Sequence, residues 1–107
     1  MKILLEECVT KRLKPYLSLH EVATVTEKGW SRLKNGQLMT AASGEGFDIL
    51  LTIDKNLQHQ QNVGQYPLIV VVLNCLSSKL EVMITFLPSF EKQLSGFTKG
   101  NAYLVEK

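Results

Sequence analysis

The stretch Gly46-Phe-Asp-Ile-Leu-Leu-Thr-Ile-Asp-Lys-Asn-Leu57 decides the fold of this chain. Residues 47–53 are almost all apolar or β-branched, and the run stops at Asp54, Lys55 and Asn56. A run of this length, bounded by a glycine and a polar cluster, is typical of a strand buried on both faces. Such strands belong to parallel sheets covered by helices, where ligands collect at the carboxyl ends of the strands. Asp54 follows that end and is therefore a candidate site residue.

Segments with strand and helix patterns alternate on both sides of this run. Strands are expected over residues 2–5, 20–25, 67–73 and 102–105. Helices are expected over residues 9–17, 37–43 and 56–62, and from Ser77 or Ser78 to Leu94, with Asn35 as a cap and Pro15 and Pro88 as breaks.

This alternation predicts an α/β fold, a three-layer α/β/α sandwich with a central, mostly parallel sheet of about five strands. If the strand order is 2-1-3-4-5, the first and third strands are neighbours. Glu6 and Asp54, each just past its strand, would then face one another at the switch point.

In the first helical segment, Val9, Leu13, Tyr16 and Leu17 recur at helical spacing and predict the buried side of an amphipathic helix. Lys11, Arg12 and Lys14 fall on its outer side.

Size and composition predict one domain without a membrane span. The chain has 107 residues and a formal net charge of +2, too small to prove a nucleic-acid partner. The longest apolar run, residues 67–73, is far shorter than the roughly 20 residues that cross a bilayer. No signal peptide is visible, so Cys8 and Cys75 are expected to be reduced thiols in a cytoplasmic protein.

Three acids are placed to hold a hard metal ion. Glu6, Glu7 and Asp54 follow strands, and carboxylates from separate strand ends can bind Mg²⁺ or Mn²⁺. Such an ion activates water and stabilises charge on a phosphate during hydrolysis. Spacing alone leaves the structural alternative open, because Asp54 before a helix is also an N-cap candidate.

Other polar and aromatic residues leave alternatives open as well. The basic residues Lys28, Arg32, Lys34 and Lys55 are expected in loops near this edge, either to meet phosphates or as a solvated surface. Trp30 is expected either to pack its loop or to wall a pocket. His20 and His59 have no partners at metal or triad spacing and are expected to face solvent.

Six short motifs, spread over most of the chain, occur together in one known family. They are Lys2-Ile-Leu-Leu-Glu-Glu7, His20-Glu-Val-x-Thr-Val25, Gly29-Trp30, Leu33-Lys-Asn-Gly36, Gly46-Phe-Asp-Ile-Leu-Leu-Thr52 and Asp54-Lys-Asn-Leu57. Together they resemble the small PIN-like proteins of the DUF5615 family, and the block over residues 29–62 is the most specific part.

The resemblance implies a single PIN-like domain over residues 1–107 that cuts RNA with Mg²⁺ or Mn²⁺. It also implies a toxin of a toxin–antitoxin pair, with a small antitoxin-like partner protein as inhibitor, and a homodimer. Read in this way, the metal ligands are Glu6, Glu7 and Asp54, with Asn35 or Gln37 orienting water. The residues that would contact RNA are Lys55, Asn56, Lys34 and Trp30.

The chain departs from the family pattern at three positions. Glu6 stands where the family usually has aspartate, and its extra methylene moves the carboxylate oxygens by about an ångström, which an octahedral site tolerates poorly. Asn35 and Gln37 are neutral where related sequences often carry an acid. These departures favour an alternative function, a catalytically inactive PIN-like module that binds a partner protein or RNA.

Overall fold

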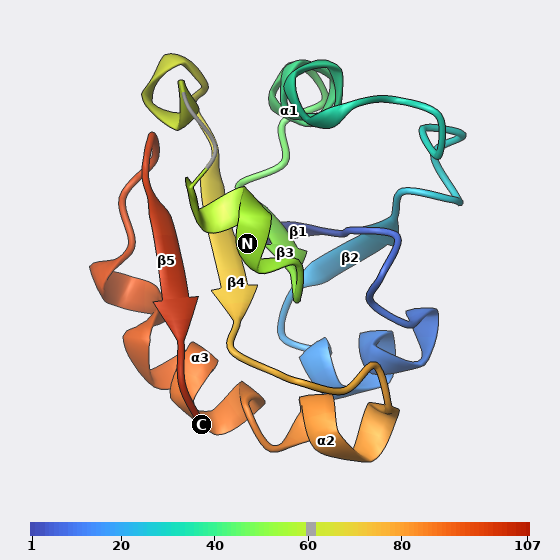
Figure 1. The fold of residues 1–107 in the computed structure, drawn as a ribbon, viewed down its shortest axis with the longest axis vertical. Helices are drawn as coiled ribbons and strands as arrows, with labels where there is room; N and C mark the ends of the chain where they lie inside the picture. Colours follow the sequence, from blue (N-terminus) through green and yellow to red (C-terminus); the bar gives the residue numbers. More distant parts are fainter. Residues whose placement is uncertain (60–61) are drawn as a thin grey trace.

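Five parallel strands form one sheet, as the sequence predicts (Figure 1). The computed structural model describes residues 1–59 and 62–107. The strands are β1 (Lys2–Leu5), β2 (Glu21–Thr24), β3 (Ile49–Thr52), β4 (Ile69–Leu73) and β5 (Ala102–Val105). Their order is β2-β1-β3-β4-β5, the order for which the sequence predicts that β1 and β3 are neighbours. β1 and β3 are neighbours, with Leu5 opposite Leu51.

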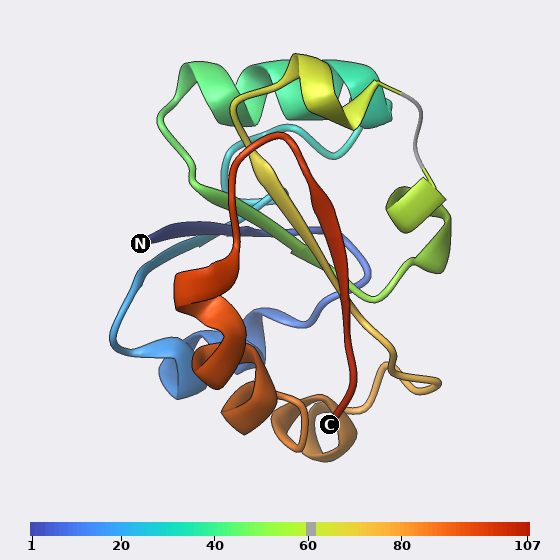
Figure 2. The same cartoon turned by 90° about the vertical axis from the view of Figure 1, so that its left-hand side faces the viewer.

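Helices cover both faces of the sheet and complete the three layers (Figure 2). One face carries the 3-10 helix η1 (Lys11–Leu17), α2 (Leu80–Ile84), α3 (Leu87–Gln93) and the short turn η4 (Leu94–Gly96). The other face carries α1 (Asn35–Gly44) and two 3-10 helices, η2 (Lys55–His59) and η3 (Val63–Gln65).

Alternating side chains of the central strands feed two separate cores. Ile49 and Leu51 of β3 belong to the core beneath η1, α2 and α3, whereas Leu50 belongs to the core beneath α1. Successive side chains of a strand point to opposite faces, so β3 and β4 are buried on both sides along their whole length. The prediction of doubly buried central strands is confirmed.

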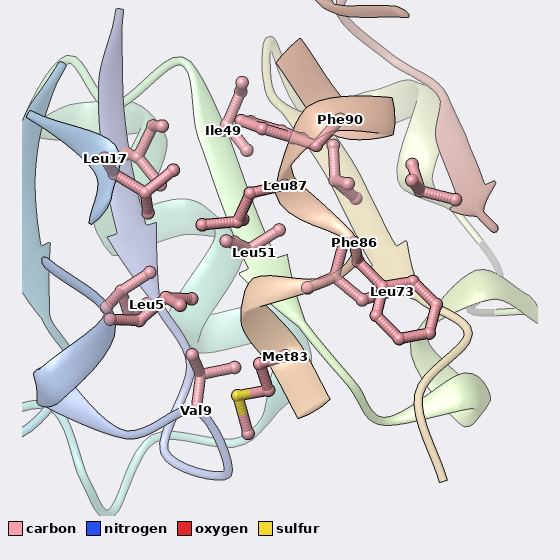
Figure 3. Packing of buried hydrophobic residues seen from close by; sticks show 14 of the residues in the cluster. Leu5, Val9, Leu17, Ile49, Leu51, Leu73, Met83, Phe86, Leu87 and Phe90 are labelled. Carbon is pink, nitrogen blue, oxygen red and sulfur yellow. The ribbon is translucent and has the colours of Figure 1, made fainter. Parts of the chain in front are cut away.

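Figure 3 shows how the second half of the chain closes the first of these cores. Leu87 and Phe90 of α3 lie over Ile49 and Leu51, while Met83 of α2 lies near Val9. Phe90 is fully buried. α2 and α3 thus pack against β1, β3 and β4, and the loops at the strand ends start from well-packed strands.

The first helical segment differs from the expected amphipathic α-helix. η1 is a 3-10 helix with Pro15 inside it, and Tyr16 is 53% exposed although Leu13 and Leu17 are buried. Proline removes a backbone donor and clashes with the carbonyl four residues earlier, which disfavours α-helical winding. With about three residues per turn, side chains no longer share the face that a period of 3.6 predicts.

Other helix boundaries also differ from the predictions. α1 begins at Asn35, with Lys34 instead of Asn35 at the N-cap position. The segment predicted to start at Ser77 or Ser78 begins at Leu80 and is divided into α2 and α3. Pro88 lies in the first turn of α3, where its missing N–H has no helical partner to lose. Of the helix predicted over 56–62, residues 60–61 lie outside the described residues.

His20 is not solvent-facing as predicted. Its side chain is 7% exposed, its Nε2 lies 2.8 Å from Glu91 Oε1, and its ring meets Phe90 edge-on. The residue therefore links the start of β2 to α3. The side chain of His59 lies outside the described residues.

Both cysteines are free thiols, as predicted. Within residues 1–59 and 62–107, no helix is long and apolar enough to cross a membrane.

Candidate functional site at the carboxyl edge of the sheet

Glu6 and Glu7 directly follow β1 at the carboxyl edge of the sheet. The backbone N–H of Glu6 donates to the Leu51 carbonyl oxygen at 2.9 Å, which continues the pairing with β3 beyond the strand. Glu6 Oε2 accepts a hydrogen bond from the backbone N–H of Cys8 at 2.7 Å. One oxygen of this carboxylate therefore shapes the turn after β1, and the other oxygen remains as a donor atom for a ligand.

Glu7 has no such local task. Its side chain is exposed, and it has no hydrogen bond or ion pair with any residue in the described part of the chain.

Asp54 follows β3 by two residues and is held by its own turn. Its backbone N–H donates to Thr52 Oγ1 at 3.0 Å, and its Oδ1 accepts from the Asn56 backbone N–H at 3.0 Å. This is the geometry of a cap at the start of η2. The structural alternative for Asp54 is thus present, although its second oxygen is not used by that bond.

Four of the predicted residues line a single hollow of about 140 Å³. They are Glu6, Glu7, Trp30 and Asn35, accompanied by Val25, Ser31, Leu33 and Leu38. The hollow lies between the end of β1 and the first turn of α1. Gln37 Oε1 accepts the Lys34 backbone N–H at 3.1 Å, which fixes that first turn.

The other predicted residues lie apart from this hollow. Asp54, Lys55 and Asn56 do not line it. Lys55 Nζ donates to the Cys75 carbonyl oxygen at 3.1 Å, which ties the turn after β3 to the loop after β4. The predicted site is therefore divided, with its β1 and α1 members together and its β3 members beside them.

Trp30 combines both roles that the sequence left open. Its ring meets Phe47 edge-on, with centroids 6.1 Å apart, and so packs onto the α1 core. The same side chain is only partly buried and lines the hollow beside Glu6 and Glu7. Lys28 Nζ lies 5.5 Å from its ring centroid, a cation–π distance.

Two groups beside Glu6 have pKa values shifted from their ordinary values. Lys14, with Nζ 2.9 Å from Glu27 Oε1, lowers the pKa of Glu27, and hydrogen bonds from Thr24 lower it further. Burial raises the pKa of the Cys8 thiol, which lies 3.3 Å from Thr52 Oγ1. Cys8 is accordingly a protonated, packed side chain and not an activated nucleophile.

Sequence reasoning missed the position of Lys11 beside Glu6 and Glu7. A second hollow, of about 310 Å³, shares these two acids with the first and adds Thr10, Lys11 at the start of η1, and Glu27 of the turn after β2. The helical pattern placed Lys11 only on an outer face. The available signal was the short connection between Glu7 and Lys11, which keeps η1 close to the end of β1.

Within the described residues, no group of three or more His, Cys, Asp and Glu side chains converges as a metal cluster would. A Mg²⁺ site needs fewer protein ligands, since the ion is often held by one or two carboxylates with several waters and substrate phosphates. Glu6 and Glu7 line the same hollow and are the candidates for such a smaller ligand set.

Comparison with known proteins adds no further constraint, because no protein-family model, curated protein or solved structure matches this chain.

Proposed function

We propose that this chain is a PIN-like, divalent-metal-dependent ribonuclease that acts at the carboxyl edge of its sheet. One observation carries the proposal. Glu6 and Glu7 share a hollow with Asn35 and Trp30, so two acids, a neutral amide and an aromatic wall face one space. The resemblance to the PIN-like family supplies the reaction class, hydrolysis of an RNA phosphodiester.

The donor atoms are those that Mg²⁺ and Mn²⁺ prefer, whereas zinc and copper sites typically include thiolate or imidazole ligands. Carboxylate and amide oxygens are the ligands that hard ions prefer, whereas the nearby thiol of Cys8 is turned to Thr52. Once bound, the ion would supply Lewis acidity and an activated water.

The protein's own residues divide the remaining work. Glu6 and Glu7 would hold the ion, and Asp54 would add a third negative charge from the neighbouring strand end. Asn35 orients the attacking water, and Trp30 gives a nucleobase a flat apolar face. Lys34, before α1, and Lys55 with Asn56, after β3, flank the two sides on which phosphates would lie.

Titration with Mn²⁺ by calorimetry tests the proposal. Glu6→Gln and Glu7→Gln keep size and polarity and remove one charge each, so each is expected to weaken Mn²⁺ binding at least about tenfold. Glu81→Gln, on the exposed side of α2, makes the same chemical change elsewhere and should bind like the unaltered protein. The proposal is overturned if all three variants bind Mn²⁺ as the unaltered chain does.

A second candidate function, a PIN-like module that binds RNA or a partner protein without cutting RNA, has its own observation. In both Glu6 and Asp54, one carboxylate oxygen accepts a hydrogen bond from a backbone N–H two residues further on, as in acids that only stabilise a turn. This module would show no saturable Mn²⁺ binding at millimolar metal and no Mn²⁺-dependent cleavage of a single-stranded RNA.

A further inference from the structure

Three hollows follow one another along the carboxyl edge and share their walls. The first, of about 510 Å³, is lined by Lys11, Arg12, Lys14, Pro15 and Glu27. The second, of about 310 Å³, shares Lys11 and Glu27 with the first. It also shares Glu6, Glu7 and Val25 with the third, the hollow of about 140 Å³ beside Trp30. We call this continuous depression from η1 to α1 the η1 trough.

The end of the η1 trough at η1 carries uncompensated positive charge. Lys14 is neutralised by Glu27, to whose two carboxylate oxygens it donates at 2.9 and 3.1 Å. Lys11 and Arg12 are both exposed, and their side chains have no ion-pair or hydrogen-bond partner among the residues that the structure describes. Two free cations therefore stand beside a wall that continues to Glu6 and Glu7.

The order of groups along the η1 trough is cationic, then acidic, then aromatic. A polyanion without bases would leave Trp30 without a contact, and a cationic partner would be repelled by Lys11 and Arg12. A strand that carries phosphates and unstacked bases can use all three parts, with phosphates on the cations and a base on Trp30. A duplex lacks exposed base faces, so the arrangement favours a single strand.

We propose that single-stranded RNA lies along the η1 trough, with the phosphates flanking the cut site bound by Lys11 and Arg12. This inference rests on the proposed function and adds the path of the substrate to it. The acidic centre then lies within the bound strand instead of at its end, so cleavage is internal.

Fluorescence anisotropy of a labelled single-stranded RNA in EDTA tests the path without any metal chemistry. The variant Lys11→Gln/Arg12→Gln removes two exposed charges without touching the core, so we expect it to fold as the unaltered chain does. Each lost phosphate contact lowers the salt slope of log Kobs by about 0.7 for a single strand, so the double variant should lose about 1.4. Its affinity at 50 mM salt should fall more than about tenfold.

The matched control is Lys92→Gln/Lys107→Gln, which removes two exposed charges from α3 and the segment after β5, outside the η1 trough; within the described residues neither side chain has an ion-pair partner. It should retain RNA affinity within about twofold, since non-specific attraction depends only weakly on distant charges in salt. Equal losses in the two double variants overturn the proposed path, and so does an unaltered chain that binds no RNA.

The failures of path and function are distinguishable. Loss of RNA binding in Lys11→Gln/Arg12→Gln, together with absent Mn²⁺ binding, supports the η1 trough and refutes the nuclease. Mn²⁺ binding that depends on Glu6 and Glu7, together with unchanged RNA binding in Lys11→Gln/Arg12→Gln, supports the nuclease and refutes the path.

Discussion

Substitution of Asp54 separates a carboxylate that caps a turn from one that serves a metal ion. Asp54 Oδ1 accepts the backbone N–H of Asn56 at 3.0 Å at the start of η2. Asparagine offers an acceptor oxygen of the same reach without the charge, whereas alanine offers none. Asp54→Asn therefore keeps the cap and removes the charge, and Asp54→Ala removes both.

The size of the effect follows from the exposure of the cap. Loss of an N-cap acceptor costs about 0.5–2 kcal/mol, and this bond, which is open to solvent, belongs in the lower half of that range, at about 1 kcal/mol. An unfolding entropy of about 2.1 cal/mol/K per residue converts 1 kcal/mol into a Tm change of about 4 °C for 107 residues. For Asp54→Asn we expect less than about 0.5 kcal/mol, from the charge near the helix start alone.

Thermal unfolding followed by circular dichroism, in EDTA, measures this stability difference. Mn²⁺ calorimetry of Asp54→Asn then measures the charge, and a carboxylate that binds the ion directly or through a water should lose about tenfold in affinity. A Tm of Asp54→Asn as low as that of Asp54→Ala would refute the cap. Unchanged Mn²⁺ affinity in Asp54→Asn would remove Asp54 from the ligand set.

Three further predictions concern the frame that carries the site. Asp48 Oδ2 accepts the Lys2 backbone N–H at 2.8 Å, and Lys99 lies 3.3 Å from its Oδ1, so its pKa is held below its ordinary value of 3.8. A lowered folded-state pKa adds stability that is present above pH 4 and is lost as the pH falls through the folded value. In Asp48→Asn, the free energy of unfolding in urea should therefore fall less steeply on the acid side of its pH profile. An unchanged slope would contradict this prediction. Phe90→Ala empties a fully buried position and should cost about 3–5 kcal/mol in urea unfolding, while Leu76→Ala, at a 95% exposed position, should cost almost nothing; similar losses would refute the assigned core. Gly46 has a φ of +81°, and an added Cβ would meet no neighbouring atom, so Gly46→Ala should lower the free energy of unfolding by about 1–2 kcal/mol through backbone strain alone. An added Cβ at Gly44 also has open space, and Gly44→Ala should not destabilise α1.

The sheet could be predicted from sequence because its signal is strong and repeated. Residues 49–52 and 69–73 are buried on both faces, and only a parallel sheet between two helical layers offers that environment. The weaker patterns of β2 and β5 then fall at the edges, where burial is lower.

The helices were harder to predict because their winding depends on single residues. Pro15 and the turn after Asp54 give 3-10 helices, in which the spacing of apolar residues no longer has a period of 3.6. His20 was misplaced for a different reason. Its partner, Glu91, is 71 residues away along the chain, and no local pattern indicates that contact.

The position of Glu6 and Glu7 at a strand end could be predicted from sequence, but the separation of Asp54 from them could not. From a strand order of 2-1-3-4-5 we expected Glu6 and Asp54 to face one another. β1 and β3 are neighbours, with Leu5 opposite Leu51, but Asp54 does not line the hollows that contain Glu6. The inclusion of Asn35 and Trp30 depends on where α1 begins, and the inclusion of Lys11 depends on how tightly the chain turns into η1.

Substitution of Glu7 separates an effect on metal binding from an effect on stability better than substitution of Glu6 or Asp54 does. A parallel strand must turn away where it ends, so acids that shape turns and acids that bind ligands occur at the same positions, and sequence cannot separate them. Glu6 and Asp54 each accept a hydrogen bond within their turns, so truncating either one to alanine changes structure together with charge. Glu7 lines both hollows yet contacts no other described residue by hydrogen bond or ion pair, so Glu7→Gln should leave the Tm within about 1 °C. Any loss of Mn²⁺ binding in Glu7→Gln therefore reports on the ion alone, and a fall in Tm would mean that Glu7, too, is a structural acid.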